Sequence, residues 1–159
     1  ILMAGTLKVK IEENIILDNQ DYGSKRTFEI GSIANITKKI VTIAGDDDAT
    51  VLVFKSTTAS ADGALDLQTV KYIRITNLDS SNSVNISLQL DSDESNSAAD
   101  LSITHLLEAG RSFMMGAPDE AAHADDDSAS IVTALTDLES IIVDPGSNSG
   151  QVEVFVAST

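Results

Sequence analysis

Alternation of apolar and polar residues at period two is the feature that most constrains this chain. Residues 70–90 contain it twice, as Y-I-R-I-T and V-N-I-S-L-Q-L, on either side of a polar cluster at residues 77–83. Period two places successive side chains on opposite faces of a strand, so each run has an apolar face for a core and a polar face for solvent. We predict two antiparallel strands here, joined by the polar cluster as a hairpin.

The same pattern recurs along most of the chain. Short alternating or apolar runs, separated by Gly, Asn, Asp and Ser, occur at residues 7–11, 25–33, 40–43, 51–54, 101–106, 111–115, 141–143 and 151–156. The runs at 40–43 and 51–54 flank G-D-D-D-A, which is typical of a hairpin with a short loop. Helix is expected only as single turns near residues 63–66 and 134–139. The sequence therefore predicts an all-β fold, an antiparallel β-sandwich, jelly-roll-like, with about 9–10 short strands and little helix.

A chain of 159 residues is long enough for one domain with a hydrophobic core. Aromatic residues make up 4% of the chain and Trp is absent, so the core must be built from Ile, Val and Leu. These residues favour strands when they are β-branched. We predict a single β-sandwich domain over residues 1–159, with an N-terminal strand arm at residues 1–24.

The formal charge of −15 is unevenly distributed. Residues 1–79 carry nine Lys and Arg against eleven acids, or −2, and residues 80–159 carry one against fourteen, or −13. A field of this sign repels phosphates, so neither nucleic acid nor an anionic membrane is an expected partner. We expect the acidic half to serve solubility or to face a basic or a cation-rich partner, and the less acidic N-terminal half to face an acidic neighbour.

No residue pattern indicates a reaction. Cys is absent, and no G-x-S-x-G elbow or Gly-rich phosphate loop occurs. The Asp runs at residues 46–48 and 125–127 are interpreted as solvated turns, His105 as a structural, half-buried strand residue, and His123 as a solvated loop residue. We predict no enzymatic activity, no catalytic residues and no cofactor-binding residues.

Residues 91–95, D-S-D-E-S, resemble the start of an EF-hand calcium loop. The Gly expected at position 6 is Asn96 here, and the Glu expected at position 12 is Ser102. We therefore predict no built metal site. A weakly bound Ca²⁺ held by Asp91, Asp93 and Glu94 stays open as an alternative.

The N-terminus lacks the basic and apolar regions of a signal peptide, and no apolar run is long enough to span a membrane. Met3 followed by A-G is typical of a natural start. We expect a product made in the cytoplasm of a host cell and not exported.

Four segments carry a resemblance to a known class of proteins. They are K-Y-I-R-I-T-N-L-D (residues 71–79), N-S-V-N-I-S-L-Q-L (82–90), H-L-L-E-A-G-R-S-F-M-M (105–115) and G-Q-V-E-V-F-V-A-S-T (150–159). Their order resembles small β-sandwich virion structural proteins of tailed bacteriophages, marine ones in particular, over residues 70–159. These motifs are structural and bring no catalytic residue with them.

The resemblance implies a non-enzymatic virion structural protein, in the first place a capsid decoration (cement) protein that bridges capsid subunits. A tail, neck or fibre component is the alternative within the same class. The implied partners are further copies of the chain, as a homo-oligomer for which we expect a trimer, and the major capsid protein or other virion proteins. The implied location is the virion. A carbohydrate- or cation-binding β-sandwich module is a second alternative, although scarce Trp and Tyr disfavour sugar stacking.

Overall fold

The computed structural model describes residues 4–56, 63–90, 101–124, 131 and 134–159. Within these ranges every regular element is a β-strand. The strands are β1 (Gly5–Glu13), β2 (Ile16–Leu17), β3 (Gln20–Asp21), β4 (Ser24–Ile33), β5 (Asn35–Ile43), β6 (Ala49–Lys55), β7 (Leu65–Asp66), β8 (Val70–Asn77), β9 (Val84–Leu90), β10 (Leu101–Leu107), β11 (Ser112–Met115), β12 (Leu138–Asp144) and β13 (Gly150–Ser158). The all-β prediction is therefore confirmed.

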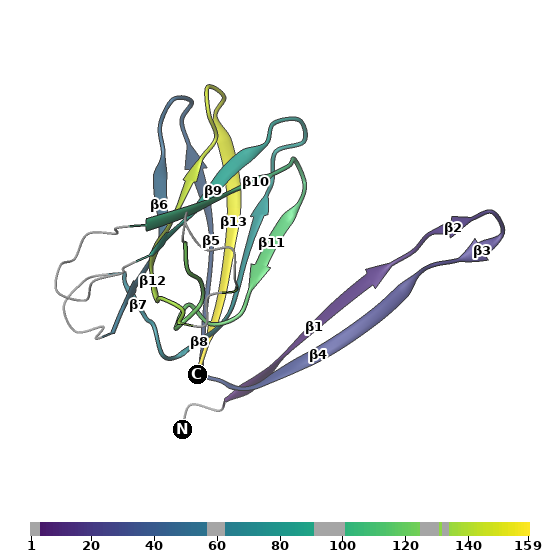
Figure 1. Ribbon diagram of the computed structural model, residues 1–159, viewed down its shortest axis with the longest axis horizontal. Helices are drawn as coiled ribbons and strands as arrows, with labels where there is room; N and C mark the ends of the chain where they lie inside the picture. Colours follow the sequence, from purple (N-terminus) through teal and green to yellow (C-terminus); the bar gives the residue numbers. More distant parts are fainter. Residues whose placement is uncertain (1–3, 57–62, 91–100, 125–130, 132–133) are drawn as a thin grey trace.

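Nine of these strands form two facing sheets (Figure 1). One sheet has the order β10-β9-β12-β6-β7 and the other the order β11-β8-β13-β5. All neighbours are antiparallel except the short parallel pair β6–β7. The order β5-β13-β8-β11 facing β6-β12-β9-β10 is the arrangement of a jelly roll, in which two Greek keys wrap into a sandwich. This confirms the predicted architecture.

Two predicted hairpins are wrong, although their strands are correct. β8 and β9 lie in different sheets, and so do β5 and β6. Their connections cross from one sheet to the other because each strand turns its apolar face toward the same core. Asn77 holds the connection from β8 to β9 in place. It is fully buried, and its Nδ2 donates to the carbonyls of Asn82 and Leu107 at 2.8 and 3.2 Å.

The predicted helical turns are also wrong. Leu65–Asp66 pairs with β6 as β7, and Leu138 begins β12. Residues 134–137 form no helix and no strand, apart from an isolated β-bridge between Thr136 and Ala122. In both places pairing with neighbouring strands, β6 for β7 and β6 and β9 for β12, satisfies backbone groups that a lone helical turn would leave unpaired.

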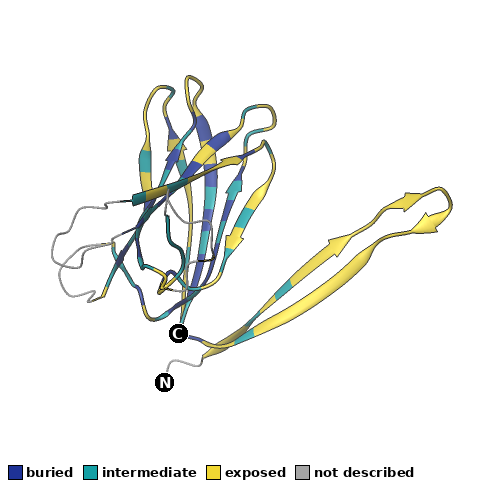
Figure 2. Ribbon diagram, viewed as in Figure 1, coloured by how far each residue is buried: buried dark blue, intermediate teal, exposed yellow. Residues whose placement is uncertain are grey.

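The core lies between the two sheets (Figure 2). It is built from the alternating residues identified in the sequence, with Ile73 and Ile75 of β8 facing the inner residues of β9 and β12 in the other sheet. Its largest fully buried side chains are Val51, Phe54, Val70, Ile73, Ile75, Val84, Ile86, Leu90, Leu138, Ile141, Val143 and Val152. Each Ile, Leu or Val taken from water contributes roughly 1.5–3 kcal/mol before chain entropy is subtracted.

The first strands do not join the sandwich. β1 pairs with β4 over Leu7–Ile30 to Glu13–Ser24, and this hairpin projects from one end of the sandwich, beside the C-terminus (Figure 1). We call the hairpin from Gly5 to Ile33 the arm. The expected arm at residues 1–24 is longer in the structure, because the Ser24–Ile33 strand returns along β1. Its thirteen residues from Gly5 to Leu17 span about 40 Å at about 3.3 Å per residue.

Candidate interaction surface

The end of the arm is a tight turn dictated by its sequence. Asp18 and Asn19 both have positive φ, 51° and 63°, between the short strands β2 and β3. Asp and Asn tolerate this left-handed backbone, and two such residues in succession match the twist of antiparallel strands. Tyr22 N donates to the carbonyl of Ile15 at 3.0 Å, and Gly23 N donates to Asp21 Oδ1 at 2.8 Å. We call residues 14–23 the arm tip.

The arm carries a large share of the exposed apolar side chains of the described residues. Six of them lie on it: Ile11, Ile15, Ile16, Leu17, Tyr22 and Phe28. Ile16 is 76% exposed and Leu17 is 57% exposed. Figure 2 shows exposure along nearly the whole hairpin, with partly buried residues only toward its base. Because grouped exposed apolar side chains are common at interaction sites, the arm is a candidate interaction surface.

The arm has little to stabilise it by itself. Its cross-strand ion pairs, Lys8–Glu29 at 2.6 Å and Lys25–Glu12 at 3.2 Å, are about half exposed, and such pairs contribute roughly 0–1 kcal/mol. A two-stranded hairpin in water is marginally stable, and both of its edges offer unpaired backbone groups. Beyond its base, the described part of this hairpin therefore has no second layer of the same chain packed on it.

The arm base packs against the sandwich. Ile33, Tyr72 and Ala157 form a small buried cluster, and Leu7, Val9, Ile30 and Phe155 pack against it. The Tyr72 ring lies 6.5 Å from the Phe28 ring and 6.1 Å from the Phe155 ring, centroid to centroid. Burial raises the pKa of Tyr72, and the charge of Arg74 offsets part of that rise. This cluster sets the direction in which the arm leaves the body.

The same cluster sits at one end of a larger surface, the outward face of the four-stranded sheet. Strand register places Ile36 opposite Ala157, Lys38 opposite Phe155, and Ile40 opposite Glu153, while Met114 lies opposite Arg74. We call this the outer sheet face, made of Ile36, Lys38, Ile40, Thr42, Tyr72, Arg74, Thr76, Ser112, Met114, Gln151, Glu153, Phe155 and Ala157. Ile36, Ile40 and Met114 on it are 52%, 60% and 44% exposed.

The charge of the outer sheet face differs in sign from that of the whole chain. The charged side chains on this face are Lys38, Arg74 and Glu153, which together give a net charge of +1. The five-stranded sheet contains three acids and Lys55. The outer sheet face is therefore a basic and apolar region on a chain of net charge −15.

Glu153 is held at the centre of this face by two cations. Its carboxylate accepts from Arg74 and lies 3.3 Å from the Lys38 ammonium, and the Arg74 guanidinium lies 5.8 Å from the centre of the Phe155 ring. Burial alone raises the pKa of Glu153, but the hydrogen bonds and charges of Lys38 and Arg74 outweigh it and keep the pKa below its ordinary value. The arrangement fixes side chains across β5, β13 and β8.

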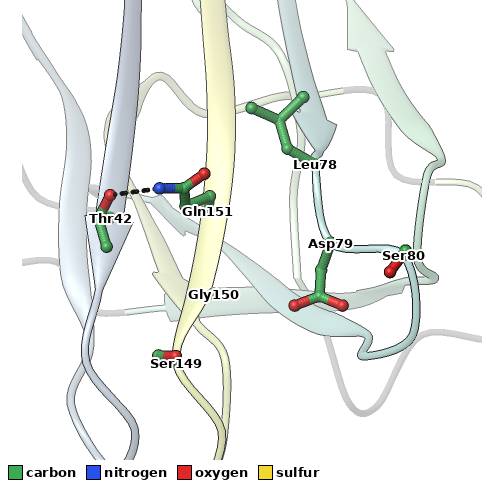
Figure 3. Close-up of a pocket in the computed structure, with 7 residues that line it drawn as sticks. All are labelled: Thr42, Leu78, Asp79, Ser80, Ser149, Gly150 and Gln151. Carbon is green, nitrogen blue, oxygen red and sulfur yellow. Dashed lines mark hydrogen bonds between the residues drawn. The ribbon is translucent and has the colours of Figure 1, made fainter.

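An open hollow of about 360 Å³ lies at the far end of the outer sheet face (Figure 3). It is lined by Thr42, Leu78, Asp79, Ser80, Ser149, Gly150 and Gln151. Gln151 Nε2 donates to Thr42 Oγ1 at 3.0 Å across its wall. The one carboxylate, Asp79, accepts from the backbone N–H groups of Asn82 and Ser81, which lower its pKa. With that carboxylate committed to its own turn and no aromatic ring in the lining, the hollow gives little support to sugar or cation binding.

The sequence-predicted site residues do not come together. Asp91, Asp93 and Glu94, the alternative calcium ligands, lie outside the described residues, and so does the Asp run at 125–127. The Asp run at 46–48 is exposed in the β5–β6 turn. In the part of the chain that the structure describes, no three His, Cys, Asp or Glu are grouped to hold a metal ion. Nor does any helix in that part have the length and apolar character to cross a membrane.

Both histidines differ from their sequence interpretation. His105 was expected to be half-buried, but it is exposed on the edge strand β10, where its ring lies 5.7 Å from the Phe113 ring. His123 was expected to be solvated, but it is partly buried, with Nδ1 3.3 Å from Thr136 Oγ1. Periodicity assigns a face to a residue, and it does not show how much of that face a neighbouring loop covers.

Sequence reasoning missed the outer sheet face. Its signal is present as Ile36, Lys38 and Ile40, which alternate with the inward residues Thr37 and Val41 of the same strand. A strand with apolar residues on both faces indicates that its second face also meets another surface.

Comparisons with known proteins leave the family of this chain open. No protein-family model matches it, and no curated protein matches it. Among solved structures it is similar to a chain described under "Bacillus endospore appendages form a novel family of disulfide-linked pili", with 12% identity, 78% of this chain and 88% of that chain covered, and a TM-score of 0.36. A similarity at this level carries no conclusion about fold or function.

Proposed function

We propose that this chain is a non-enzymatic structural protein of a virion, a capsid decoration protein that acts by binding neighbouring subunits. The observation that carries the proposal is the arm: a hairpin of about 40 Å with exposed Ile and Leu at its tip, attached to a closed sandwich. Beyond its base the arm contributes nothing to the core, and the apolar surface of its tip is of use only in an assembly.

The virion part of the proposal rests on two further observations. The strands between residues 70 and 159 carry the motifs that resemble small phage structural proteins. The jelly-roll order of the sheets is an architecture that viral capsid proteins share with lectins and cupins. The second support is an analogy of fold, which many functions use, so the motifs and the arm carry more weight.

A tail, neck or fibre component would use the same arm and the same outer sheet face. The two roles differ in where the chain lies on the particle. Immunogold labelling of purified particles separates them, because a decoration protein gives label over the capsid and a tail component gives label at one vertex or beyond it.

The proposal is tested on particles from the source of this chain. Particles are purified on a density gradient, and the chain is quantified in the particle fraction and in the soluble fraction. We expect the chain to co-sediment with particles in many copies. A chain present only in the soluble fraction would contradict a virion role.

A reconstitution experiment tests whether the chain stabilises the particle as a cement protein. Particles stripped of the chain are incubated with the purified wild-type chain or with a Leu106→Asp control, which alters an exposed apolar residue (66% exposed) of the other sheet. Both are expected to rebind and to restore resistance to heat. Particles whose thermal stability is unchanged by rebinding would exclude a cement role.

A further inference from the structure

We infer that the arm tip of one copy of this chain binds the outer sheet face of a second copy. The contact is head-to-tail, because the two surfaces that meet are different parts of the molecule. This inference rests on the proposed structural role and names the partner of the arm.

The two surfaces are complementary in charge. Residues 14–23 contain Asp18 and Asp21 and no Lys or Arg. The outer sheet face presents Lys38 and Arg74, and on the four strands beneath it Glu153 is the single acid, already paired with both. A tip with a charge of −2 therefore meets a face with a net charge of +1, which attracts the partner and favours one orientation.

The two surfaces also match in apolar character. At the tip, Ile15, Ile16 and Leu17 are each more than half exposed. On the face, Ile36 and Ile40 are likewise more than half exposed, in a row along β5. A contact with an apolar centre and charged residues around it is the usual composition of a specific protein interface.

The geometry requires a second molecule. The arm leaves the sandwich at the Ile33–Ala157 end and points away from it, so its tip lies far from its own outer sheet face (Figure 1). The exposed part of the face begins next to the arm base, which already covers Tyr72. An incoming tip would thus cover the remaining part of an apolar surface, whose first part is already covered by the chain's own arm base.

The face, and not the edge, of the sheet is the docking site. β5 is an edge strand, since β13 is its one neighbour in the sheet. Its free edge carries the adjacent lysines Lys38 and Lys39, and lysine on an edge strand opposes pairing with another strand. Packing of side chains on the face involves no strand pairing, so the edge lysines do not oppose it.

A head-to-tail contact makes a mixing experiment decisive. The tip variant Ile16→Asp/Leu17→Asp keeps an intact face, and the face variant Ile36→Asp/Ile40→Asp keeps an intact tip. Both change exposed residues, so the melting temperature of each is expected to stay close to that of the wild type; this is measured first. Leu106→Asp is the matched control on the other sheet.

Light scattering during size exclusion gives the masses. We expect the wild type and Leu106→Asp to form oligomers, and each double variant alone to weaken association by about 100-fold or more, leaving monomers. An equimolar mixture of the two variants is expected to form dimers and nothing larger, because one intact tip and one intact face remain per pair.

Three results would overturn the inference: a wild-type chain that stays monomeric at its highest soluble concentration, a tip variant that assembles as the wild type does, or a mixture that stays monomeric. Binding of the monomeric wild type to stripped particles separates the two proposals. If the chain binds particles without self-association, the virion role stands and the second-copy contact fails. If it self-associates and binds no particle, the reverse holds.

Discussion

Asn77 gives the sharpest test of how the sandwich is closed. It is fully buried at the end of β8, and its side chain makes three hydrogen bonds: Nδ2 to the carbonyls of Asn82 and Leu107, and Oδ1 from Asp79 N at 3.0 Å. Each bond contributes roughly 0.5–1.5 kcal/mol, and a buried group left without a partner costs roughly 1–3 kcal/mol. Asn77→Ala should therefore destabilise the fold by about 3 kcal/mol, which lowers the melting temperature by about 6–12 °C in a domain of this size.

Thermal and urea unfolding followed by circular dichroism measure this change. Ser83→Ala, an exposed residue of the same loop, is the control and should change stability by less than about 0.5 kcal/mol. Asn77→Asp has the same shape but turns a donor into an acceptor beside two carbonyls, so it should be at least as destabilising as Asn77→Ala at neutral pH. A loss below about 1 kcal/mol in Asn77→Ala would refute the role of this side chain in holding the crossing.

Three further predictions follow from other parts of the structure. Because the folded-state pKa of Glu153 is depressed, the stability that its charge contributes is present above its ordinary pKa of 4.5 and is lost as the pH falls through the folded value. Glu153→Gln should therefore melt below the wild type at neutral pH, with the difference shrinking as the pH falls below 4.5; a difference independent of pH would contradict the ion-pair account. Tyr72→Ala removes the rings' contact at the arm base, so amide hydrogen exchange in Leu7 to Ile11 should accelerate while exchange at Val154 stays slow; equal exchange in mutant and wild type would show that the cluster does not orient the arm. A Cβ at Gly45 would lie 2.4 Å from the carbonyl oxygen of Ser147, so Gly45→Ala should cost about 1–3 kcal/mol, whereas Gly31→Ala, with open space around it, should be near neutral in the same melts.

Sequence alternation specified which residues face the core, and it did not specify which strands pair. Ile73 and Ile75 are buried as expected, and the strands around them begin and end close to their predicted limits. The connection from β8 to β9 was taken for a hairpin because its Asn and Ser residues suit any tight turn. In the structure Asn77 is inside the fold, where it ties the loop to the carbonyl of Leu107 from β10. A buried polar anchor of this kind depends on a contact thirty residues away, which local pattern does not reveal.

The interaction surface was partly visible in the sequence. The N-terminal strand was expected to act as an arm, and its apolar residues at positions 15–17 stand among Asn and Asp with no core to join. The return strand β4 was missed as part of the arm, because alternation reads the same in a hairpin and in a sheet. The outer sheet face depends on β5, β13, β8 and β11 lying side by side. That neighbourhood joins strands far apart along the chain and emerges only from the jelly-roll order.

The central claim is that the arm tip of one copy binds the outer sheet face of a second copy, and the mass of the chain in solution tests it most directly. Light scattering on the wild type is compared with Ile16→Asp/Leu17→Asp at equal concentration. We expect a wild-type mass that is a multiple of 16.8 kDa and a variant mass of one subunit, with equal melting temperatures. Equal masses for both proteins, whether single or multiple, would contradict it.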